Sequence, residues 1–341
     1  MTDGRALQRR PPPPMPLTVL TGFLGAGKTT LLNTLLRDPA LADTVLINEF
    51  GEIGLDHLLV EKVDDGMVML SSGCLCCTIR GDLVTALEKL TRDLDTGRVT
   101  FRRVIIETTG LADPAPVLHT IMAHPYLVLR YRLDGVVTLV DAINGLATLD
   151  AHVESVKQSA VADRIVLTKT DLAGSAERRV SVDQLRARLR RLNPAAPILD
   201  AAAGEASASR LLDCGLYDPD SKTPDVKRWL ADEAYAAPHE HAHHDHHDVN
   251  RHDDRIRAFT LASNKAIPDG TFEMFLDLLR SLHGPNLLRV KGIVKIAEEP
   301  TRPVVIHGVQ HVFHPPATLT GWPDTDRRTR LVLSCATSSR A

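Results

Sequence analysis

The chain has 341 residues, a net charge of −3 at pH 7 and an ordinary globular composition, with 43% hydrophobic and 24% charged residues. This length predicts two domains. The weakly acidic charge and the lack of a long basic stripe argue against a nucleic-acid-binding protein, and no apolar run is long enough to span a bilayer. Of five cysteines, three lie within four positions, which indicates a reduced compartment and metal binding rather than a disulfide framework.

Residues 1–16 (MTDGRALQRRPPPPMP) contain basic residues but no apolar core of a signal peptide. Their proline run favours an extended, disordered tail. We therefore expect a cytoplasmic protein whose fold begins at residue 17.

Residues 22–29 (GFLGAGKT) match G-x-x-x-x-G-K-[ST], the phosphate-binding loop. The glycines let backbone N–H groups surround phosphate oxygens, the lysine contacts the β- and γ-phosphates, and the threonine hydroxyl binds Mg²⁺. A buried strand is predicted at residues 17–20, before the loop, and a helix at residues 30–37, with its N-terminus facing the phosphates. The predicted nucleotide-binding residues here are Gly22, Gly25, Ala26, Gly27, Lys28, Thr29 and Thr30, of which Lys28 and Thr29 are also predicted to be catalytic.

Short β-branched and aliphatic runs alternate with helical stretches over residues 17–215. The runs predict strands at residues 17–20, 44–47, 67–70, 104–106, 136–140, 165–167 and 198–199, and helical spacing is clear at 82–94 and 182–192. Such alternation predicts an α/β P-loop NTPase fold, with a mostly parallel sheet covered by helices.

Two segments that follow predicted strands place carboxylates at the edge of the sheet where such folds bind ligands. Residues 48–56 (NEFGEIGLD) contain Glu49 and Glu52 among glycines, which suits a mobile loop over Mg²⁺ and the γ-phosphate; solvated loop acids are the alternative. Residues 107–114 (ETTGLADP) provide Glu107, which we expect to support Mg²⁺ through water or to orient the attacking water. Gly110 of this segment is predicted to contact the γ-phosphate.

Base recognition is predicted at residues 168–171 (TKTD), which resemble the N-K-x-D guanine motif of GTPases. Asp171 can accept hydrogen bonds from the N1–H and 2-amino groups of guanine, and adenine offers neither donor on that edge. Lys169 would lay its aliphatic stem over the base. Thr168 replaces the commoner asparagine, which removes an amide that usually holds this loop in place. The expected ligands are GTP and GDP.

Three cysteines, Cys74, Cys76 and Cys77, lie in the sequence GCLCC. A strand would direct Cys76 and Cys77 to opposite faces, whereas a loop can bring all three together. A helix predicted to begin near Asp82 would lower the pKa of the thiols. Thiolates favour Zn²⁺, with Co²⁺ as an alternative, and three ligands leave an open position from which the metal can be released. An inert buried cluster and a redox role are the other interpretations.

Residues 216–254 end in PHEHAHHDHHDVNRHDD, a stretch with almost no apolar residues, which indicates a flexible linker. Closely spaced imidazoles bind Zn²⁺, Ni²⁺ or Co²⁺ with modest selectivity. The tract is therefore predicted to be either a metal reservoir or a solvated spacer. The histidines predicted to bind metal are His239, His241, His243, His244, His246 and His247.

Residues 255–341 are predicted to form a smaller α/β domain of mixed strand order. Its strands are expected at residues 256–261, 287–296, 303–310 and 330–333, and its helix at 270–282. His307, His311 and His314 are interpreted as ordinary surface or core residues, with contact to a partner as the alternative.

The phosphate loop, NEFGEIGLD, GCLCC, ETTGLADP and TKTD, taken in order, resemble the motifs of the CobW-type GTPase metallochaperones, relatives of the nickel-insertion GTPases for hydrogenase and urease. The resemblance extends through the histidine-rich linker to LLRVKGIVKI and VIHGVQHVFHP near the C-terminus. It implies GTP hydrolysis coupled to transfer of zinc from the cysteine loop to a client metalloprotein. Open alternatives are cobalt or iron insertion, for cobalamin synthesis or a nitrile-hydratase-like client, and a zinc-storing or regulatory GTPase switch. Whether the chain forms a homodimer is also open.

Overall fold

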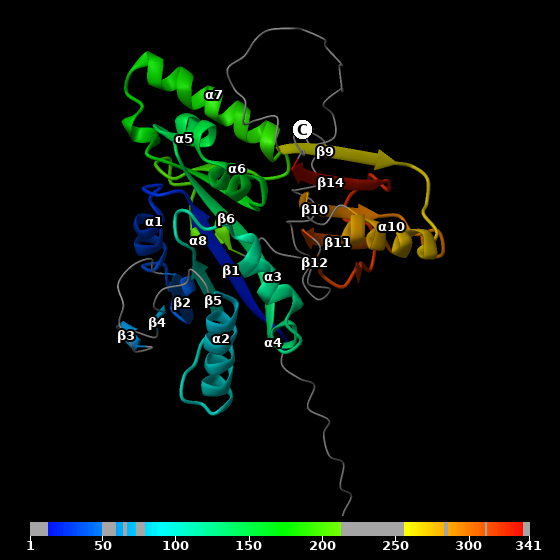
Figure 1. Ribbon diagram of the computed structural model, residues 1–341, viewed down its shortest axis with the longest axis horizontal. Coiled ribbons are helices and arrows are strands. Elements are labelled where there is room, and N and C mark those ends of the chain that lie inside the picture. Colours follow the sequence, from blue (N-terminus) through cyan, green and yellow to red (C-terminus); the bar gives the residue numbers. More distant parts are fainter. Residues whose placement is uncertain are drawn as a thin grey trace, which may run out of the picture.

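The structure is a computed structural model that describes residues 13–49, 59–63, 67–72, 79–212, 256–282, 286–310 and 312–336. Figure 1 shows a large sheet with helices on both faces, followed along the chain by a smaller sheet beside it. The cysteine loop and the histidine tract lie outside the described residues, as do residues 1–12 of the predicted tail. No helix in the described part of the chain is both long and apolar enough to cross a membrane.

The large sheet has eight strands in the order β3-β4-β2-β5-β1-β6-β7-β8. All neighbours pair in parallel except β3 and β4, which are antiparallel. The carboxyl ends of the parallel strands therefore lie at one edge, where doubly wound sheets bind ligands. The strands are β1 (Met15–Gly22), β2 (Thr44–Glu49), β3 (Leu59–Val63), β4 (Met67–Ser72), β5 (Arg103–Glu107), β6 (Tyr131–Asp141), β7 (Arg164–Thr168) and β8 (Ile198–Asp200).

Both faces of the large sheet are covered by helices, because its central strands have apolar side chains on both sides. On one face, α1 (Lys28–Leu35) and α8 (Ala208–Leu211) pack into the same cluster as Leu20 and Ile105. On the other face, further helices pack around Leu17, Val19 and Val104. They are α2 (Ile79–Asp95), α3 (Ala115–Ala123), α5 (Gly145–Ala151), α6 (Val153–Ala160) and α7 (Ala176–Leu192), with α4 (Leu127–Arg130) after α3.

All seven predicted strands of this sheet are present, but several boundaries differ from the prediction. Strand β1 begins at Met15, inside the predicted tail, and β6 begins at Tyr131 rather than at residue 136. The polar start of β6 contains Asp134, which is fully buried and accepts a hydrogen bond from Thr18 at 3.0 Å and one from Arg103. Because both donors come from distant parts of the chain, the local sequence around Asp134 contains no pattern that would predict the start of this strand. Strand β3 was not predicted.

The smaller sheet has the order β12-β11-β10-β14-β9, with β13 also paired to β11. Every pairing in it is antiparallel, so the prediction of a mixture of parallel and antiparallel pairs is wrong. Helix α10 (Asp269–Leu282) covers one face through Phe272, Leu276 and Leu279. The strands are β9 (Ile256–Ser263), β10 (Leu287–Val294), β11 (Val304–Val309), β12 (Val312–Phe313), β13 (Ala317–Thr318) and β14 (Thr329–Ala336).

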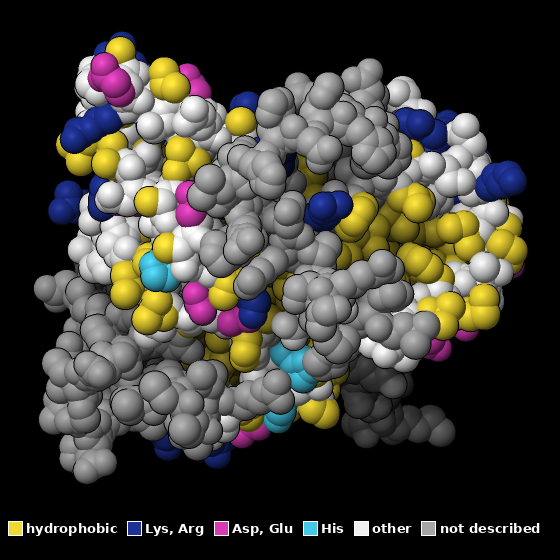
Figure 2. Space-filling model, turned by 45° about the horizontal axis from the view of Figure 1, so that its top comes forward, with side chains coloured by type: hydrophobic (Ala, Val, Ile, Leu, Met, Phe, Trp, Pro, Cys, Tyr) yellow, Lys and Arg dark blue, Asp and Glu magenta, His cyan; other side chains and the backbone are white. Residues whose placement is uncertain are grey.

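Apolar side chains also gather on the outside of this part of the molecule (Figure 2). Large apolar residues exposed there are Phe259 and Leu261 of β9 and Met274 and Leu278 of α10. They lie at the edge strand and on the outer side of the helix, away from the large sheet.

The two sheets are joined through a buried ionic cluster. Asp163, at the turn before β7, accepts hydrogen bonds from Arg289 and Lys291 of β10, and all three side chains are buried. Arg289 also donates to the carbonyl of Val161, the residue directly after α6. Burial alone would raise the pKa of Asp163, but the two cations hold it well below its usual range. The carboxylate is therefore ionised inside the interface.

His307 of β11 is next to this cluster and is 3% exposed. Burial, together with the charges of Arg289 and Lys291, holds its pKa well below the usual value, so its imidazole is neutral. The ring of His314 lies 5.5 Å away, centroid to centroid. His307 is thus a core residue of the interface and cannot face an external partner.

Candidate nucleotide site

The phosphate-binding loop joins the end of β1 to the start of α1. Gly27 precedes the helix with φ of 89°, a left-handed conformation that favours glycine. The amino group of Lys28 donates to the carbonyls of Gly22 at 2.7 Å and Phe23 at 3.2 Å. Burial lowers the pKa of Lys28, with partial opposition from Glu107. The lysine is therefore bonded to its own loop, and Thr29 and Thr30 beside it are exposed.

Glu107 ends β5, the strand beside β1, and is 5% exposed. Burial raises the pKa of this carboxyl, and the nearby charge of Lys28 opposes the rise. The next residue, Thr108, donates from its backbone N–H to Leu20 at 2.9 Å and from its hydroxyl to Thr21 at 2.8 Å. These bonds place the segment 107–110 alongside the phosphate-binding loop.

Gly110 packs directly on this loop. A Cβ atom at Gly110 would lie 2.6 Å from the backbone nitrogen of Leu24, a distance that real side chains do not adopt. Glycine is thus required here by the close approach of the two segments. A shift of the segment that contains Gly110 must therefore displace the phosphate-binding loop, and the reverse.

The segment 110–113 is also bonded to helix α6. The side-chain amide of Gln158 donates to the carbonyls of Ala112 at 2.9 Å and Gly110 at 3.2 Å, and Lys157 pairs with Asp113 at 3.0 Å. Because Val161 at the end of α6 accepts from Arg289, one short helix contacts both this segment and the smaller sheet. Gln158 and Lys157 were not predicted as site residues, since nothing in their local sequence distinguishes them from other helical polar residues.

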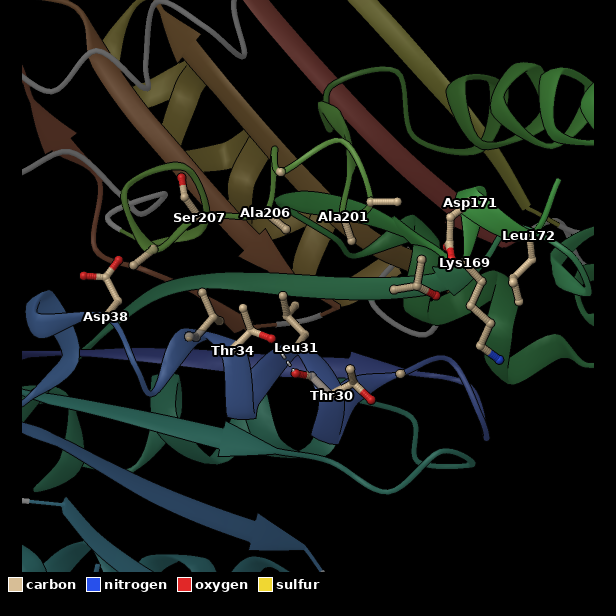
Figure 3. A pocket seen from close by; sticks show the side chains of 16 residues that line it. Thr30, Leu31, Thr34, Asp38, Lys169, Asp171, Leu172, Ala201, Ala206 and Ser207 are labelled. Carbon is tan, nitrogen blue, oxygen red and sulfur yellow. Dashed lines mark hydrogen bonds between the residues drawn. The ribbon is translucent and has the colours of Figure 1, made fainter. Parts of the chain in front are cut away.

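A pocket of about 580 Å³ opens between α1, the segment 168–172 and the loop after β8. Figure 3 shows Thr30, Leu31 and Thr34 along α1, with Lys169, Asp171 and Leu172 across from them. Gly27 of the phosphate-binding loop is part of the same lining. The loop after β8 contributes Ala201, Ala202, Gly204, Ala206, Ser207 and Ala208. The pocket thus joins Gly27 and Thr30 of the predicted phosphate-binding set with the predicted base-recognition residues Thr168, Lys169 and Asp171. The other predicted phosphate-binding residues, Lys28 and Thr29 among them, are not part of its lining.

Thr168 ends β7 and bonds to the phosphate-binding loop, since its hydroxyl donates to the carbonyl of Ala26 at 2.8 Å. The Thr168 hydroxyl therefore connects the end of β7 to the phosphate-binding loop. Lys169 has φ of 59° and pairs with Asp141, at the end of β6, at 2.7 Å. Burial alone would raise the pKa of Asp141, but hydrogen bonds from Lys169, Asn144 and Ile143 lower it overall. Asp171 is exposed on the pocket wall, in the 3-10 turn Thr170–Leu172 (η2).

The remaining predicted site residues lie in parts of which less is described. Glu49 is the last residue of β2, and its side chain is outside the described part. Cys74, Cys76 and Cys77 fall between β4 and α2, and the histidine tract falls between α8 and β9; neither segment is described. Among the residues that are, no group of three or more His, Cys, Asp or Glu side chains is arranged to hold a metal. The predicted zinc site stays a prediction.

The donor set of the described residues fits a nucleotide. A loop with two left-handed glycines, Gly25 and Gly27, is followed directly by a helix N-terminus, which favours phosphate. Lys28 donates to carbonyl oxygens that phosphate oxygens can replace, and the Thr29 hydroxyl and the buried Glu107 are oxygen ligands of the type that Mg²⁺ prefers. The fold and the site together define a P-loop nucleotide-binding protein.

Comparison with known proteins identifies the family. Residues 16–200 match the model of the CobW/HypB/UreG nucleotide-binding domain, and residues 256–337 match that of the cobalamin synthesis protein cobW C-terminal domain. The chain therefore belongs to the CobW/HypB/UreG family, as its motifs predicted.

Relatives are similar over most of the chain. The zinc chaperone YjiA of Escherichia coli is 34% identical over 88% of this chain and 87% of its own length. The zinc-regulated GTPase metalloprotein activator 1 of Schizosaccharomyces pombe is 36% identical over 60% of this chain and 50% of its own length. A zinc-bound triple mutant of the YjiA GTPase superposes with a TM-score of 0.70 at 29% identity, covering 95% of this chain and 94% of the other. Both parts of the chain therefore have counterparts in YjiA.

Proposed function

We propose that this protein is a GTP-hydrolysing metallochaperone that binds zinc through Cys74, Cys76 and Cys77 and transfers it to a client metalloprotein. The observation that supports GTP as the nucleotide is the pocket between the phosphate-binding loop and Asp171. An exposed carboxylate at that wall is an acceptor for the N1–H and 2-amino donors of guanine. The names of its relatives, zinc chaperone and zinc-regulated GTPase, support the choice of cargo.

The roles of the site residues follow from their chemistry. Lys28 would neutralise charge on the β- and γ-phosphates, while Thr29 and Glu107 would hold Mg²⁺, which supplies further neutralisation of the phosphates. Glu107 or Glu49 would orient the attacking water. Gly110 would report the γ-phosphate, because it packs on the phosphate-binding loop so closely that no side chain fits between it and Leu24.

The proposed coupling to zinc rests on the position of the strand before the cysteines. Strand β4 is parallel to β2, so its last residue, Ser72, lies at the edge where β2 and β5 also end. The cysteine segment thus leaves the sheet from the nucleotide edge. Transfer requires different affinities for metal or client in the GTP and GDP states, because equal affinities would shift no equilibrium.

The test is GTP turnover by the purified protein without metal, with Zn²⁺ and with Co²⁺, compared with a variant in which Cys74, Cys76 and Cys77 are serine. Zinc-stimulated hydrolysis that the triple variant loses is the expected result. Cys335→Ser is the matched control, because burial raises the pKa of this half-buried thiol and makes it a poor metal ligand at neutral pH.

Other outcomes decide between the alternatives. Hydrolysis that responds to neither metal nor the cysteine variant would refute coupling and favour a storage or regulatory protein. Stimulation by Co²⁺ but not by Zn²⁺ would favour a cobalt insertase. Zinc affinities that are identical with GTP and with GDP would rule out nucleotide-driven transfer.

A further inference from the structure

Asp200 is an acidic residue at the base pocket to which the sequence analysis assigned no role. It ends β8, and its side chain is 17% exposed. The Thr170 hydroxyl donates to one of its carboxylate oxygens at 2.6 Å, and Arg186 of α7 donates to the other at 2.9 Å. Thr170 belongs to the TKTD segment, so Asp200 connects that segment to the end of the neighbouring strand.

The same carboxylate also organises the loop after β8. The oxygen that accepts from Thr170 accepts from the backbone N–H groups of Ala202 at 3.1 Å and Ala203 at 3.3 Å. The Asp200 backbone N–H donates to the Glu205 carboxylate at 2.8 Å, and the Glu205 N–H returns a bond to the Asp200 carbonyl at 3.0 Å. Residues 201–205 are thereby folded around Asp200.

These two segments are opposite parts of one binding surface. Ala201, Ala202 and Gly204 line the pocket from the loop, and Lys169 and Asp171 line it from the TKTD segment. Thr170 and Asp171 are consecutive in the 3-10 turn η2, so a bond that fixes Thr170 also fixes where the Asp171 backbone lies. Because Arg186 binds the second oxygen of the Asp200 carboxylate, this carboxylate has little freedom to rotate.

We propose that Asp200 is the positioning residue for base recognition, which holds the turn containing Asp171 at a fixed separation from the loop 201–204. The inference rests on the proposed guanine specificity. Because Asp171 would accept two bonds from guanine, an error in its position affects guanine more than a base that offers one donor or none. Asp200 itself does not contact the nucleotide in this account.

The experiment measures kcat and KM for GTP, ITP and ATP in the wild-type protein and in Asp200→Ala. The base of ITP lacks the 2-amino group and therefore reports on one of the two bonds. Loss of the bonds to Asp200 is expected to raise KM for GTP about tenfold, KM for ITP about threefold and KM for ATP little. The kcat for GTP is expected to change less than about twofold, since the phosphate-binding residues are untouched.

A second variant keeps the test valid if Asp200→Ala fails to fold. Thr170→Val removes the same hydrogen bond by deleting its donor. Like Asp200→Ala, it should raise KM for GTP more than KM for ITP. Thr170→Ser keeps the hydroxyl and should behave as wild type. Asp183→Asn, an exposed acid one turn before Arg186 on α7, is the control for removal of a charge.

Two results would overturn the proposal. One is a KM for GTP that both variants leave unchanged; the other is a rise by the same factor for GTP, ITP and ATP, as general loosening of the pocket would produce. Failure of the proposed function is distinguishable, because wild-type protein would then already use GTP and ATP equally.

Discussion

Buried or half-buried charges occur both at the nucleotide edge, the edge of the large sheet where its parallel strands end at the nucleotide site, and at the interface between the two sheets. The charges at these two places have different kinds of partner. At the nucleotide edge, Lys28 donates to carbonyl groups of its own loop, which lose little if the lysine turns to a phosphate. At the interface, Asp163 is enclosed by Arg289 and Lys291, and all three side chains are buried. Lys28 can therefore exchange its carbonyl partners for a phosphate, whereas Asp163 cannot exchange its two cations.

This difference separates two kinds of residue that look alike in the sequence. Removing a charge at the nucleotide edge should change kinetics and leave the free energy of unfolding almost constant. Removing one at the interface should do the reverse, because the remaining charge stays buried without its partner.

The largest effect is expected for Lys28→Ala. Loss of the cation that contacts the transferred phosphate should lower kcat for GTP about a thousandfold. The midpoint of thermal unfolding should stay within a few degrees of wild type, because the lysine bonds only to its own loop. Single-turnover hydrolysis and calorimetry measure the two quantities, with Lys89→Ala on helix α2 as the control. A large loss of stability would contradict the comparison.

Arg289→Met should give the opposite pattern. It leaves Asp163 buried with one cation fewer and the Val161 carbonyl without this donor, and should lower the free energy of unfolding by about 3 kcal/mol. Urea denaturation measures it. Arg302→Met is the control, since Arg302 pairs with Glu299 at the surface and such pairs contribute at most about 1 kcal/mol. An unfolding free energy equal to that of the control would refute the account.

Asp171→Asn tests base choice. An amide offers one acceptor and one donor in place of two acceptors, so KM for GTP should rise about thirtyfold. Xanthine has a carbonyl where guanine has its 2-amino group, and XTP should therefore become the better substrate of the variant. Equal KM values for GTP in variant and wild type would exclude Asp171 from base recognition.

The pH dependence of stability tests the interface independently. The folded-state pKa of His307 lies well below its unfolded value of about 6.5, so below that pH the unfolded chain binds more protons and stability falls. The slope is about 1.4 kcal/mol per pH unit for one such histidine. His314, with its pKa lowered to about 4, acts in the same direction, and Lys291 opposes protonation of both.

Unfolding free energies at pH 7.5 and 5.5 measure this effect, and His307→Gln should reduce the loss. Asp163 does not contribute in this window, because its stabilising effect is complete above its unfolded pKa of about 3.9 and is lost only at lower pH. An unchanged slope in the variant would show that His307 is not buried as a neutral group.

Thr168→Val is expected to have the smallest effect. It removes the hydroxyl that bonds to Ala26, worth about 1 kcal/mol, and should raise KM for GTP about fivefold. Thr168→Ser should be close to wild type. If valine is equally good, the bond between the two loops has no role in binding.

Much of the large sheet could be predicted because its strands are buried on both faces and are therefore continuous apolar runs, as in residues 104–106 and 165–167. Strand β3 escaped prediction because it is an edge strand of five residues that includes Glu61 and Lys62. The antiparallel order of the smaller sheet was also missed, since pairing direction depends on connections that residue patterns do not encode.

The phosphate-binding and TKTD residues could be located because each motif is contiguous. Asp200, Gln158 and Asp163 could not, because their partners are 30, about 46 and 126 residues away along the chain. An acid directly after a predicted strand was the available signal for Asp200, but many strands end this way. Long-range hydrogen bonds of single side chains are the part of this site that only the structure reveals.

The position of helix α6 determines how a movement near Gly110 reaches the smaller sheet. Gln158, the sixth of its eight residues, donates to the segment 110–113, and Val161, directly after its last residue, accepts from Arg289. The two attachment points are three residues apart, about 4.5 Å along the helix axis, and a hydrogen-bonded turn of that length hardly compresses. The last turn of α6 therefore links the segment 110–113 to the smaller sheet. A displacement of Gly110 either breaks the Gln158 bonds, breaks the bond from Arg289 to Val161, or moves the smaller sheet relative to the large one.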